Sequence, residues 1–444
     1  MTPAAAIAER EHVLGGFLEC EQERLASACH EMARAFARGG TLIPFGTGAA
    51  ATDAAHVAVE FMHPVIVGKR ALPALAPTND PTGHSTPAAL LRGGDIALAL
   101  AHGAPSAAVE DFLATARDRG LLTIAFTGAE AGGPADHVFA VQSDDPDIVQ
   151  EVQETAYHVL WELVHVFFEY PGLLNDACVT CGDVAVEAQV IALHNGSAVI
   201  ERDGAREEVA VELVDGVEVG DRVLCHAGVA LERLGPGAPP EEDPAAFLYP
   251  FLESGESDLE AVLADVRAST LQKGRDVLEL RRGIDIEAIE RCAADLRTRL
   301  ERGGRLIAFG NGGSSTDAQD AAADFLARGW PGVSLTNDSA TITALANDVG
   351  FDKSFARQLI PLAREADVAL AISPSGSSPN VVAGLEEAHR RGMLTVGITG
   401  YDGGRLAELD WLDHLFVVGS DYVPRLQEAH ATIYHLRLAE VGSR

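Results

Sequence analysis

Basic residues are scarce in this chain of 444 residues, where 33 Lys and Arg stand against 66 Asp and Glu and the formal net charge is -33. Such a surface repels a phosphate backbone at long range, so we expect no nucleic-acid partner. Long apolar runs are also missing, and the N-terminus has no basic region followed by an apolar stretch. We therefore expect a cytoplasmic protein with no membrane partner.

Cysteines are few as well. Six in a chain of this length favour reduced thiols over a disulfide framework. Cys20, Cys29 and Cys292 fall in helical patterns and are interpreted as packing residues. A hydrophobic content of 47% argues against disorder, and the length predicts two or three domains.

What the chain does contain is an internal repeat. "GGTLIPFGTGAAATDAAHVAVEF" (39–61) aligns without a gap on "GGRLIAFGNGGSSTDAQDAAADF" (303–325). Residues 95–128 align likewise on 367–400, and 143–164 on 420–441. Three blocks in the same order indicate a duplicated domain.

Each copy has the pattern of an α/β fold. Stretches such as "DVALAIS" and "LTVGIT" are continuous apolar runs, typical of a parallel sheet covered by helices on both faces. We predict two doubly wound parallel-sheet domains. Between them, short alternating stretches within residues 178–234 predict a small inserted antiparallel β-barrel. The predicted segments are 1–172, 173–236, a linker at 237–256, and 257–444.

The second copy carries two Gly- and Ser-rich turns between a strand and a helix. Gly310, Gly312 and Gly313 allow a tight turn that leaves free amides at a helix N-terminus, where anions bind. After the next strand, "SPSGSSPN" (373–380) offers several hydroxyls. Two such turns at neighbouring strand ends can surround one phosphate. The alternative is that Gly and Ser serve only as turn and cap residues.

Both turns, with "NDS" and "ALANDVGF" between them, resemble the sugar isomerase (SIS) domain, and within it the phosphoheptose isomerase family. The resemblance covers nearly all of residues 257–444. It implies a flavodoxin-like fold, a homo-oligomer, and the aldose–ketose isomerisation of a sugar phosphate, sedoheptulose 7-phosphate. By position, the substrate-binding residues implied are Asn311, Gly312, Gly313, Ser314, Arg328, Asn347, Asp348, Ser373, Pro374, Ser375, Ser378 and Gln427.

The resemblance also places catalytic and metal positions. The catalytic Glu of the family falls on Asp324 and its catalytic His on His435, and its zinc positions, where zinc is bound, fall on Asp320, Asp324, Gln427 and His435. Isomerisation needs a base at the acidic C–H and an acid at the carbonyl. Asp324 is one methylene shorter than Glu, and a misplacement of about 1 Å can cost on the order of 100-fold in rate.

In the first copy, the same positions are filled by His56, Glu60, Gln150 and His158. His56 and Glu60 are four residues apart and share a helix face. Glu60 and His158 match the catalytic pair, and all four match the zinc positions, whose N and O donors suit this metal. The alternative interpretation is an ordinary helix-surface pair and a hydrogen-bonded core histidine.

The two turns of the first copy that correspond to the phosphate turns have lost their serine hydroxyls. Ala49 and Ala50 occupy the first turn where the second copy has Gly313 and Ser314, and Ala101 and Gly103 replace Ser373 and Ser375. Because domains of this family pair and share sites, we hypothesise a pseudo-dimer. Its site would take phosphate loops from one copy and His and Glu from the other.

The inserted module resembles the hydrogenase-maturation chaperone family HypC or HupF, through "CVTCGDVAVEAQVIAL" (178–193) and "GDRVLCHAG" (220–228). The resemblance implies a functional Cys, here Cys178 or Cys181, and His226. It also implies hydrogenase-maturation proteins or the hydrogenase large subunit as partners. The alternatives are a redox pair, a zinc site that includes Cys225, or an inert spacer.

Two functions are predicted from these patterns. The first is a sugar-phosphate-binding protein, an aldose–ketose isomerase fused to the chaperone-like module. The second is a non-catalytic assembly factor for nickel–iron hydrogenase that uses its SIS domains for dimerisation and docking.

Overall fold

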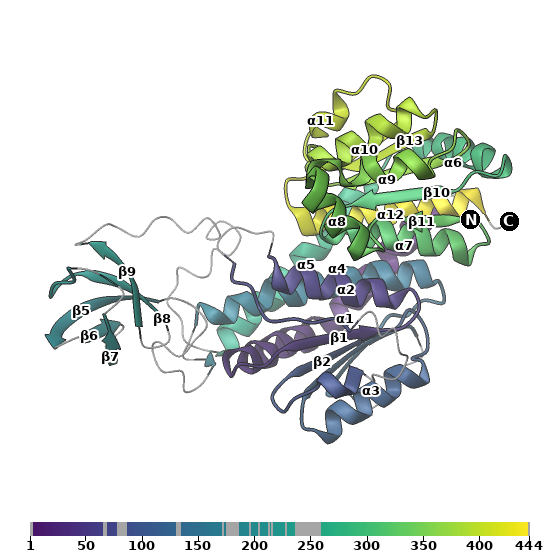
Figure 1. The fold of residues 1–444 in the computed structure, drawn as a ribbon. Helices are drawn as coiled ribbons and strands as arrows, with labels where there is room; N and C mark the ends of the chain where they lie inside the picture. The colour runs from purple at the N-terminus through teal and green to yellow at the C-terminus, as the bar shows by residue number, and fades with distance from the viewer. Residues whose placement is uncertain are drawn as a thin grey trace.

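The computed structural model describes residues 3–64, 69–77, 87–129, 135–170, 173–174, 186–194, 197–202, 205–211, 214, 216–226, 229–235 and 259–442. Two α/β units lie on either side of a layer of long helices, and a small β-barrel projects to one side (Figure 1). None of the described helices is long and apolar enough to span a bilayer. Cys178, Cys181 and the predicted linker lie outside the described residues.

The first copy is built around a parallel sheet of order β1-β2-β3-β4. Its central strand, β2, is buried along its whole length, as its apolar sequence predicts. At the edge beside β1, Leu42 forms an isolated parallel bridge with Ala74. The elements are α1 (Pro3–Ala37), β1 (Leu42–Gly46), α2 (Ala50–Met62), η1 (Pro87–Leu90), β2 (Ile96–Leu100), α3 (Ala107–Asp118), β3 (Leu122–Thr127), β4 (His137–Ala140) and α4 (Pro146–Phe168).

The second copy has a parallel sheet of order β11-β10-β12-β13-β14. Its elements are α5 (Leu259–Arg282), α6 (Ile286–Glu301), β10 (Leu306–Gly310), α7 (Gly313–Ala327), β11 (Gly332–Ser334), α8 (Ser339–Val349), η4 (Phe351–Lys353), α9 (Ser354–Leu362), β12 (Val368–Ser373), α10 (Pro379–Arg390), β13 (Leu394–Thr399), α11 (Gly404–Ala407), β14 (His414–Val417) and α12 (Val423–Val441). The prediction of two parallel-sheet domains is confirmed.

The strand order of the second sheet places the two Gly- and Ser-rich turns together. The chain leaves β10 for β11 on one side and returns to β12 on the other. Ligands bind to open α/β sheets in the crevice at such a reversal, beyond the carboxyl ends of the strands. The turns after β10 and β12 both open at this crevice.

Five strands between the copies close into a barrel of order β5-β6-β7-β9-β8. They are β5 (Val186–His194), β6 (Ser197–Arg202), β7 (Ala205–Ala210), β8 (Arg222–His226) and β9 (Val229–Gly235). Its core contains Val190, Ile200, Val223 and Cys225, all buried. Cys225 therefore belongs to the barrel core, and the zinc site with Cys178 and Cys181 stays a prediction because those two residues lie outside the described ones.

The cores of the two copies are joined through α1 and α5. Ala6 and Ile7, at the start of α1, belong to the apolar core of the second copy, although the rest of the buried face of α1 belongs to the first. Val262 and Val266 of α5 belong to the core of the first copy. The two helices approach closely at Gly274, where a Cβ atom would collide with the Leu18 side chain. The first copy therefore completes its core with a helix that belongs to the second.

Candidate functional site

Four side chains from both copies form one buried cluster. We call this cluster, with the neighbouring turn at Gly313, site A. His56 and Glu60 project from α2, His158 from α4, and Gln427 from α12 of the other copy. His56 Nε2 lies 3.7 Å from Glu60 Oε1 and 3.1 Å from Gln427 Nε2. Potential ligand atoms of His56, Glu60 and His158 all lie within 4.8 Å of one another.

The first phosphate turn of the second copy meets site A. Gly312 has a φ of 57°, and Gly313 opens α7. A Cβ atom on Gly313 would collide with Gln427 and stand 2.8 Å from His56 Nε2 and 3.1 Å from Glu60 Oε1. Only glycine therefore brings the N-terminal amides of α7 this close to the acidic and imidazole groups of the first copy.

The second turn presents hydroxyls at the end of β12. Ser373 Oγ donates to Ser378 Oγ at 3.3 Å, and Ser375 Oγ accepts from the Ser377 amide at 3.3 Å. The peptide oxygen of Pro374 accepts from the Gly400 amide at 2.8 Å, which fixes the turn against β13. Asn311, after β10, exchanges two hydrogen bonds of 2.9 Å with Asn380, at the start of α10. The two turns are therefore tied to one another.

Asn347 and Asp348 lie away from this arrangement. Asn347 donates to Asp348 at 2.8 Å, and both are exposed on α8, which has no buried residue. Among the described residues, no hydrogen bond joins them to either turn. Their assignment to the substrate site stays a prediction.

Site A holds buried polar atoms that no described residue satisfies. They are Glu60 Oε2, His158 Nε2, Ser314 Oγ and Gln427 Oε1, and each residue is at most 4% exposed. Buried polar atoms in folded proteins are almost always hydrogen-bonded, and exceptions commonly mark catalytic groups or ligand sites. Four orphaned atoms from both copies in one cluster indicate a ligand site.

The second ring nitrogen of His56, Nδ1, also has polar neighbours. This atom lies 3.2 Å from Tyr157 Oη and 3.6 Å from Asp317 Oδ1. Burial alone would lower the pKa of His56, but the neighbouring carboxylates, Glu60 and Asp317, outweigh it and raise this pKa. An acidic surrounding of this kind also suits a bound cation.

The internal repeat generates a second cluster, site B, with Asp320, Asp324 and His435 from the second copy and Thr52, Gln150 and Asp147 from the first. Asp320 is saturated with hydrogen bonds: Gln150 donates to it, Tyr434 lies at 2.9 Å and Thr52 at 3.1 Å. Burial, followed by the charges of Asp324 and Asp53, raises the pKa of Asp320 to about 8. The Thr52 hydroxyl donates toward Asp320 Oδ1 and toward the peptide oxygen of Ala49.

The remaining groups of site B pair with one another. His435 Nε2 lies 3.3 Å from Asp324 Oδ2, and Arg328 binds Asp147 at 2.5 Å. Burial alone would lower the pKa of His435, but Asp147, Asp324 and Glu151 outweigh it and raise this pKa well above its usual range. Site B is thus held by ion pairs, and Asp324 Oδ2 and His435 Nε2 make no hydrogen bond to a described residue.

The geometry corrects how the sequence grouped these residues. Gln150 contacts Asp320 rather than His56, and Gln427 contacts His56 rather than Asp320, so the two glutamines are exchanged between the sets. Arg328 pairs with Asp147 in site B and not with the turn of its own copy. The reason is helical rise: Gly313 and Arg328 stand at opposite ends of α7, about 22 Å apart.

The same argument separates Asp324 from the phosphate turn that precedes it. Eleven helical residues correspond to about 16 Å, so Asp324 and His435 cannot serve a sugar held at Gly313. Glu60 and His158 occupy that place instead. At the turn of the first copy, Thr47 bonds Ser106 at 3.0 Å.

Metal donors are available in both sites. Site A offers two imidazoles, one carboxylate and one amide oxygen, a set that suits zinc. Potential ligand atoms of Asp147, Asp324 and His435 in site B also lie within 4.8 Å of one another, but the first two are already engaged by Arg328 and His435. The free donors of site A fit the metal better.

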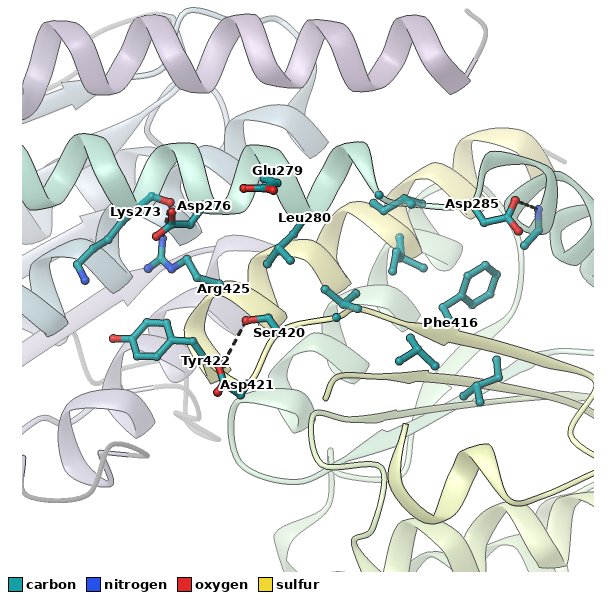
Figure 2. Close-up of a pocket in the computed structure, with 18 of the residues that line it drawn as sticks. Lys273, Asp276, Glu279, Leu280, Asp285, Phe416, Ser420, Asp421, Tyr422 and Arg425 are labelled. Atoms are coloured by element: carbon teal, nitrogen blue, oxygen red, sulfur yellow. Dashed lines mark hydrogen bonds between the residues drawn. The ribbon is translucent and has the colours of Figure 1, made fainter. Parts of the chain in front are cut away.

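A larger cavity, about 940 Å³, lies away from both sites (Figure 2). It is bounded by α5, by β14 and by the start of α12, and its wall includes Lys273, Tyr422 and Arg425. Lys273 and Arg425 both pair with the buried Glu162. These cations are therefore already neutralised.

Comparisons with known proteins agree with this architecture. A SIS-domain model matches residues 271–400, and a HupF/HypC family model matches residues 184–238. The C-terminal domain of glucosamine-fructose-6-phosphate aminotransferase from Francisella tularensis aligns over 98% of this chain and 93% of its own, with a TM-score of 0.53 and 7% identity. The likeness to this structure concerns the fold alone. The fold and the paired crevices define a protein of the SIS class.

Sequence relatives narrow the class. Phosphoheptose isomerase from Geobacter metallireducens is 43% identical over 175 residues, which is 37% of this chain and 90% of the relative. The phosphoheptose isomerase from Solidesulfovibrio magneticus is 43% identical over 34% of this chain and 75% of its own length. This chain belongs to the phosphoheptose isomerase family.

Sequence reasoning missed Asp317, Tyr157 and Glu428, which contact His56 or His158. The repeat alignment contained a usable signal, since it pairs Asp317 with Asp53, Tyr157 with Tyr434 and Glu428 with Glu151. Cys178 and Cys181 lie outside the described residues, and His226 is the last residue of β8.

Proposed function

We propose that this chain isomerises a phosphorylated aldose or ketose, of the sedoheptulose 7-phosphate type, at site A alone. The observation that carries the proposal is the set of orphaned buried atoms, Glu60 Oε2, His158 Nε2 and Ser314 Oγ, which come from both copies. A carboxylate, an imidazole and an anion-binding turn are the groups that this reaction needs.

The proposed mechanism divides the proton transfers between two side chains. The phosphate is held by the amides at Gly312 and Gly313 and by the hydroxyls of Ser314, Ser373, Ser375 and Ser378. Glu60 removes the proton from the carbon beside the carbonyl and returns it to the neighbouring carbon. His158, through Nε2, moves the accompanying proton between the two sugar oxygens, so the enediol forms and collapses without net loss of atoms.

Zinc is the proposed cofactor, which His56, Glu60 and Gln427 would hold. His158 Nε2 cannot bind the metal and carry the proton at once, so it is kept for proton transfer. When bound, it supplies Lewis-acid polarisation of the sugar oxygens. The chain's own contribution is to orient these donors through Tyr157 and Asp317 and to exclude water by burial.

Incubation with sedoheptulose 7-phosphate tests the proposal. We expect the wild-type chain to form an aldose phosphate, which chromatography or a coupled enzyme assay detects. The His158→Gln variant is expected to lose this turnover. A well-folded wild-type chain that neither turns over this sugar phosphate nor shows a thermal shift with it would favour a non-catalytic role.

We further propose that the barrel acts in nickel–iron hydrogenase maturation, because residues 184–238 match the HupF/HypC family. Its partner would be a maturation protein or the hydrogenase large subunit. Binding of the full chain to a purified large-subunit precursor tests this, with Cys181→Ala and His226→Ala expected to weaken the complex. No binding by the wild-type chain would exclude that partner.

Two further properties belong to this proposal. The chain is expected to be a cytoplasmic homo-oligomer, because a duplicated chain can reach the assembly of its family with half the number of subunits. Sedimentation equilibrium of the purified full chain measures the assembly directly.

A further inference from the structure

We infer that Glu428 is a positioning residue for His158, so that one copy supplies the imidazole of site A and the other copy orients it. This inference rests on the proposed function of site A. Glu428 Oε1 lies 2.9 Å from His158 Nδ1, and neither side chain has any exposed surface. The two residues are 270 positions apart in the chain.

The contact decides which ring nitrogen faces the substrate. A carboxylate can only accept a hydrogen bond, so the proton of the neutral imidazole resides on Nδ1. The lone pair is then left on Nε2, which is buried and receives no hydrogen bond from any described residue. An imidazole fixed in this tautomer can accept a proton from a substrate hydroxyl or bind a metal through Nε2.

Glu428 is itself held rigidly. Arg425 places Nη2 2.9 Å from Glu428 Oε1 and Nη1 3.0 Å from Oε2, and Thr155 donates to Oε2 at 3.1 Å. Arg425 also binds Glu162, and its other face borders the large cavity shown in Figure 2. A carboxylate with this many donors has one orientation, which it passes to the ring of His158.

The repeat provides a matched control in site B. Glu151 Oε1 lies 2.9 Å from His435 Nδ1 and 2.8 Å from Arg10 Nε, and Thr432 donates to Glu151 Oε2 at 2.6 Å. Glu151 and Glu428 are both fully buried and have the same kinds of partner. They differ in what stands beside the histidine: His435 Nε2 lies 3.3 Å from Asp324 Oδ2, whereas His158 Nε2 has no ion-pair partner among the described residues.

Glu428→Gln is the decisive variant. The amide of the variant has one NH2 group, which must point either toward Arg425 or toward His158 Nδ1. If it points toward His158, it donates to Nδ1 and stabilises the tautomer that carries its proton on Nε2. We expect kcat to fall about 100-fold or more, by the logic that applies when a triad Asp becomes Asn.

Two further variants separate positioning from stability. Glu428→Asp keeps the charge and should recover part of kcat. Glu151→Gln should lower thermal stability as much as Glu428→Gln but leave kcat within about threefold. Equal losses of kcat in Glu151→Gln and Glu428→Gln would overturn the inference.

A measurement independent of turnover distinguishes this inference from the proposed function. In full-length protein with ring-15N histidine, the His158 signals are assigned by their loss in His158→Gln. We expect the Nδ1–H tautomer in the wild type and a changed tautomer in Glu428→Gln. If that pattern appears without any turnover of sedoheptulose 7-phosphate, the isomerase proposal fails and the positioning of His158 stands. An Nε2–H tautomer in the wild type would refute the positioning.

Discussion

Sites A and B descend from the same repeated unit, yet they engage their buried polar groups to different extents. In site A, Glu60, His158 and Gln427 each keep an atom without a hydrogen-bond partner. In site B, Asp320 has three partners, and Asp324 Oδ2 and His435 Nε2, which make no hydrogen bond to a described residue, lie 3.3 Å apart as an ion pair. Unpaired buried groups cost folding free energy unless a ligand binds them, whereas paired ones stabilise the fold. The contrast indicates one binding site and one structural interface.

The largest expected effect comes from the catalytic pair. Glu60→Gln and His158→Gln should each lower kcat about 10²- to 10⁴-fold, the range associated with general acid–base groups. The equivalent substitutions in site B, Asp324→Asn and His435→Gln, should leave kcat within about threefold. Steady-state kinetics with sedoheptulose 7-phosphate checks this, and a greater loss from the site B variants would reverse our assignment.

Zinc content should depend on site A and not on site B. His56→Ala removes a metal donor from site A. Zinc affinity should fall by at least about 10- to 100-fold, which is the loss typical when a residue that hydrogen-bonds to a metal ligand is removed. Elemental analysis after dialysis against a dilute chelator measures the zinc retained per chain. Asp320→Asn is the control and should retain wild-type zinc. Equal zinc in the wild type and His56→Ala would contradict the assignment.

Substrate affinity should depend on the turns of the second copy only. A hydrogen bond to a charged group is worth about 1.5–3 kcal/mol, so Ser314→Ala should raise KM about 10- to 100-fold. The reciprocal change in the first copy, Ala50→Ser, restores a hydroxyl at the depleted turn and should leave KM unchanged. A fall in KM from Ala50→Ser would show that site B also binds the sugar phosphate.

The smallest effect concerns stability at site B. Because the pKa of Asp320 is raised to about 8, above the value near 4 expected for an unfolded Asp, wild-type stability falls as pH rises between these values. Asp320→Asn cannot ionise, so its melting temperature relative to the wild type should increase by a few degrees from pH 5 to pH 8. Scanning calorimetry at both pH values measures this, and a constant difference would show that Asp320 is ionised throughout.

Much of the fold could be predicted because the physical signals are local. Strands such as Val368–Ser373 are apolar throughout, and the repeated glycine turns mark where each strand passes to a helix. The proposed domain boundaries depend on segments outside the described residues and stay predictions. The packing of α5 on the first copy had no local signal, since an amphipathic helix of this kind could pack on either copy.

The candidate site was predictable in its residue types but not in its groupings. Alignment of each copy on the family placed His56 beside Gln150 and Asp320 beside Gln427. In the structure these glutamines cross to the opposite copy. Pairing across copies depends on how α2, α4, α7 and α12 pack, and that geometry is encoded in contacts between residues more than 100 positions apart.

Because α1 and α5 join the cores of the two copies, the two halves of this chain can evolve differently from the subunits of a complex of identical chains. In a complex of identical chains, every inherited substitution appears at both crevices, so neither crevice can be abandoned without damage to its twin. Here the partners are joined and interlocked, each substitution falls on one side only, and neither half can leave to pair with a copy of itself.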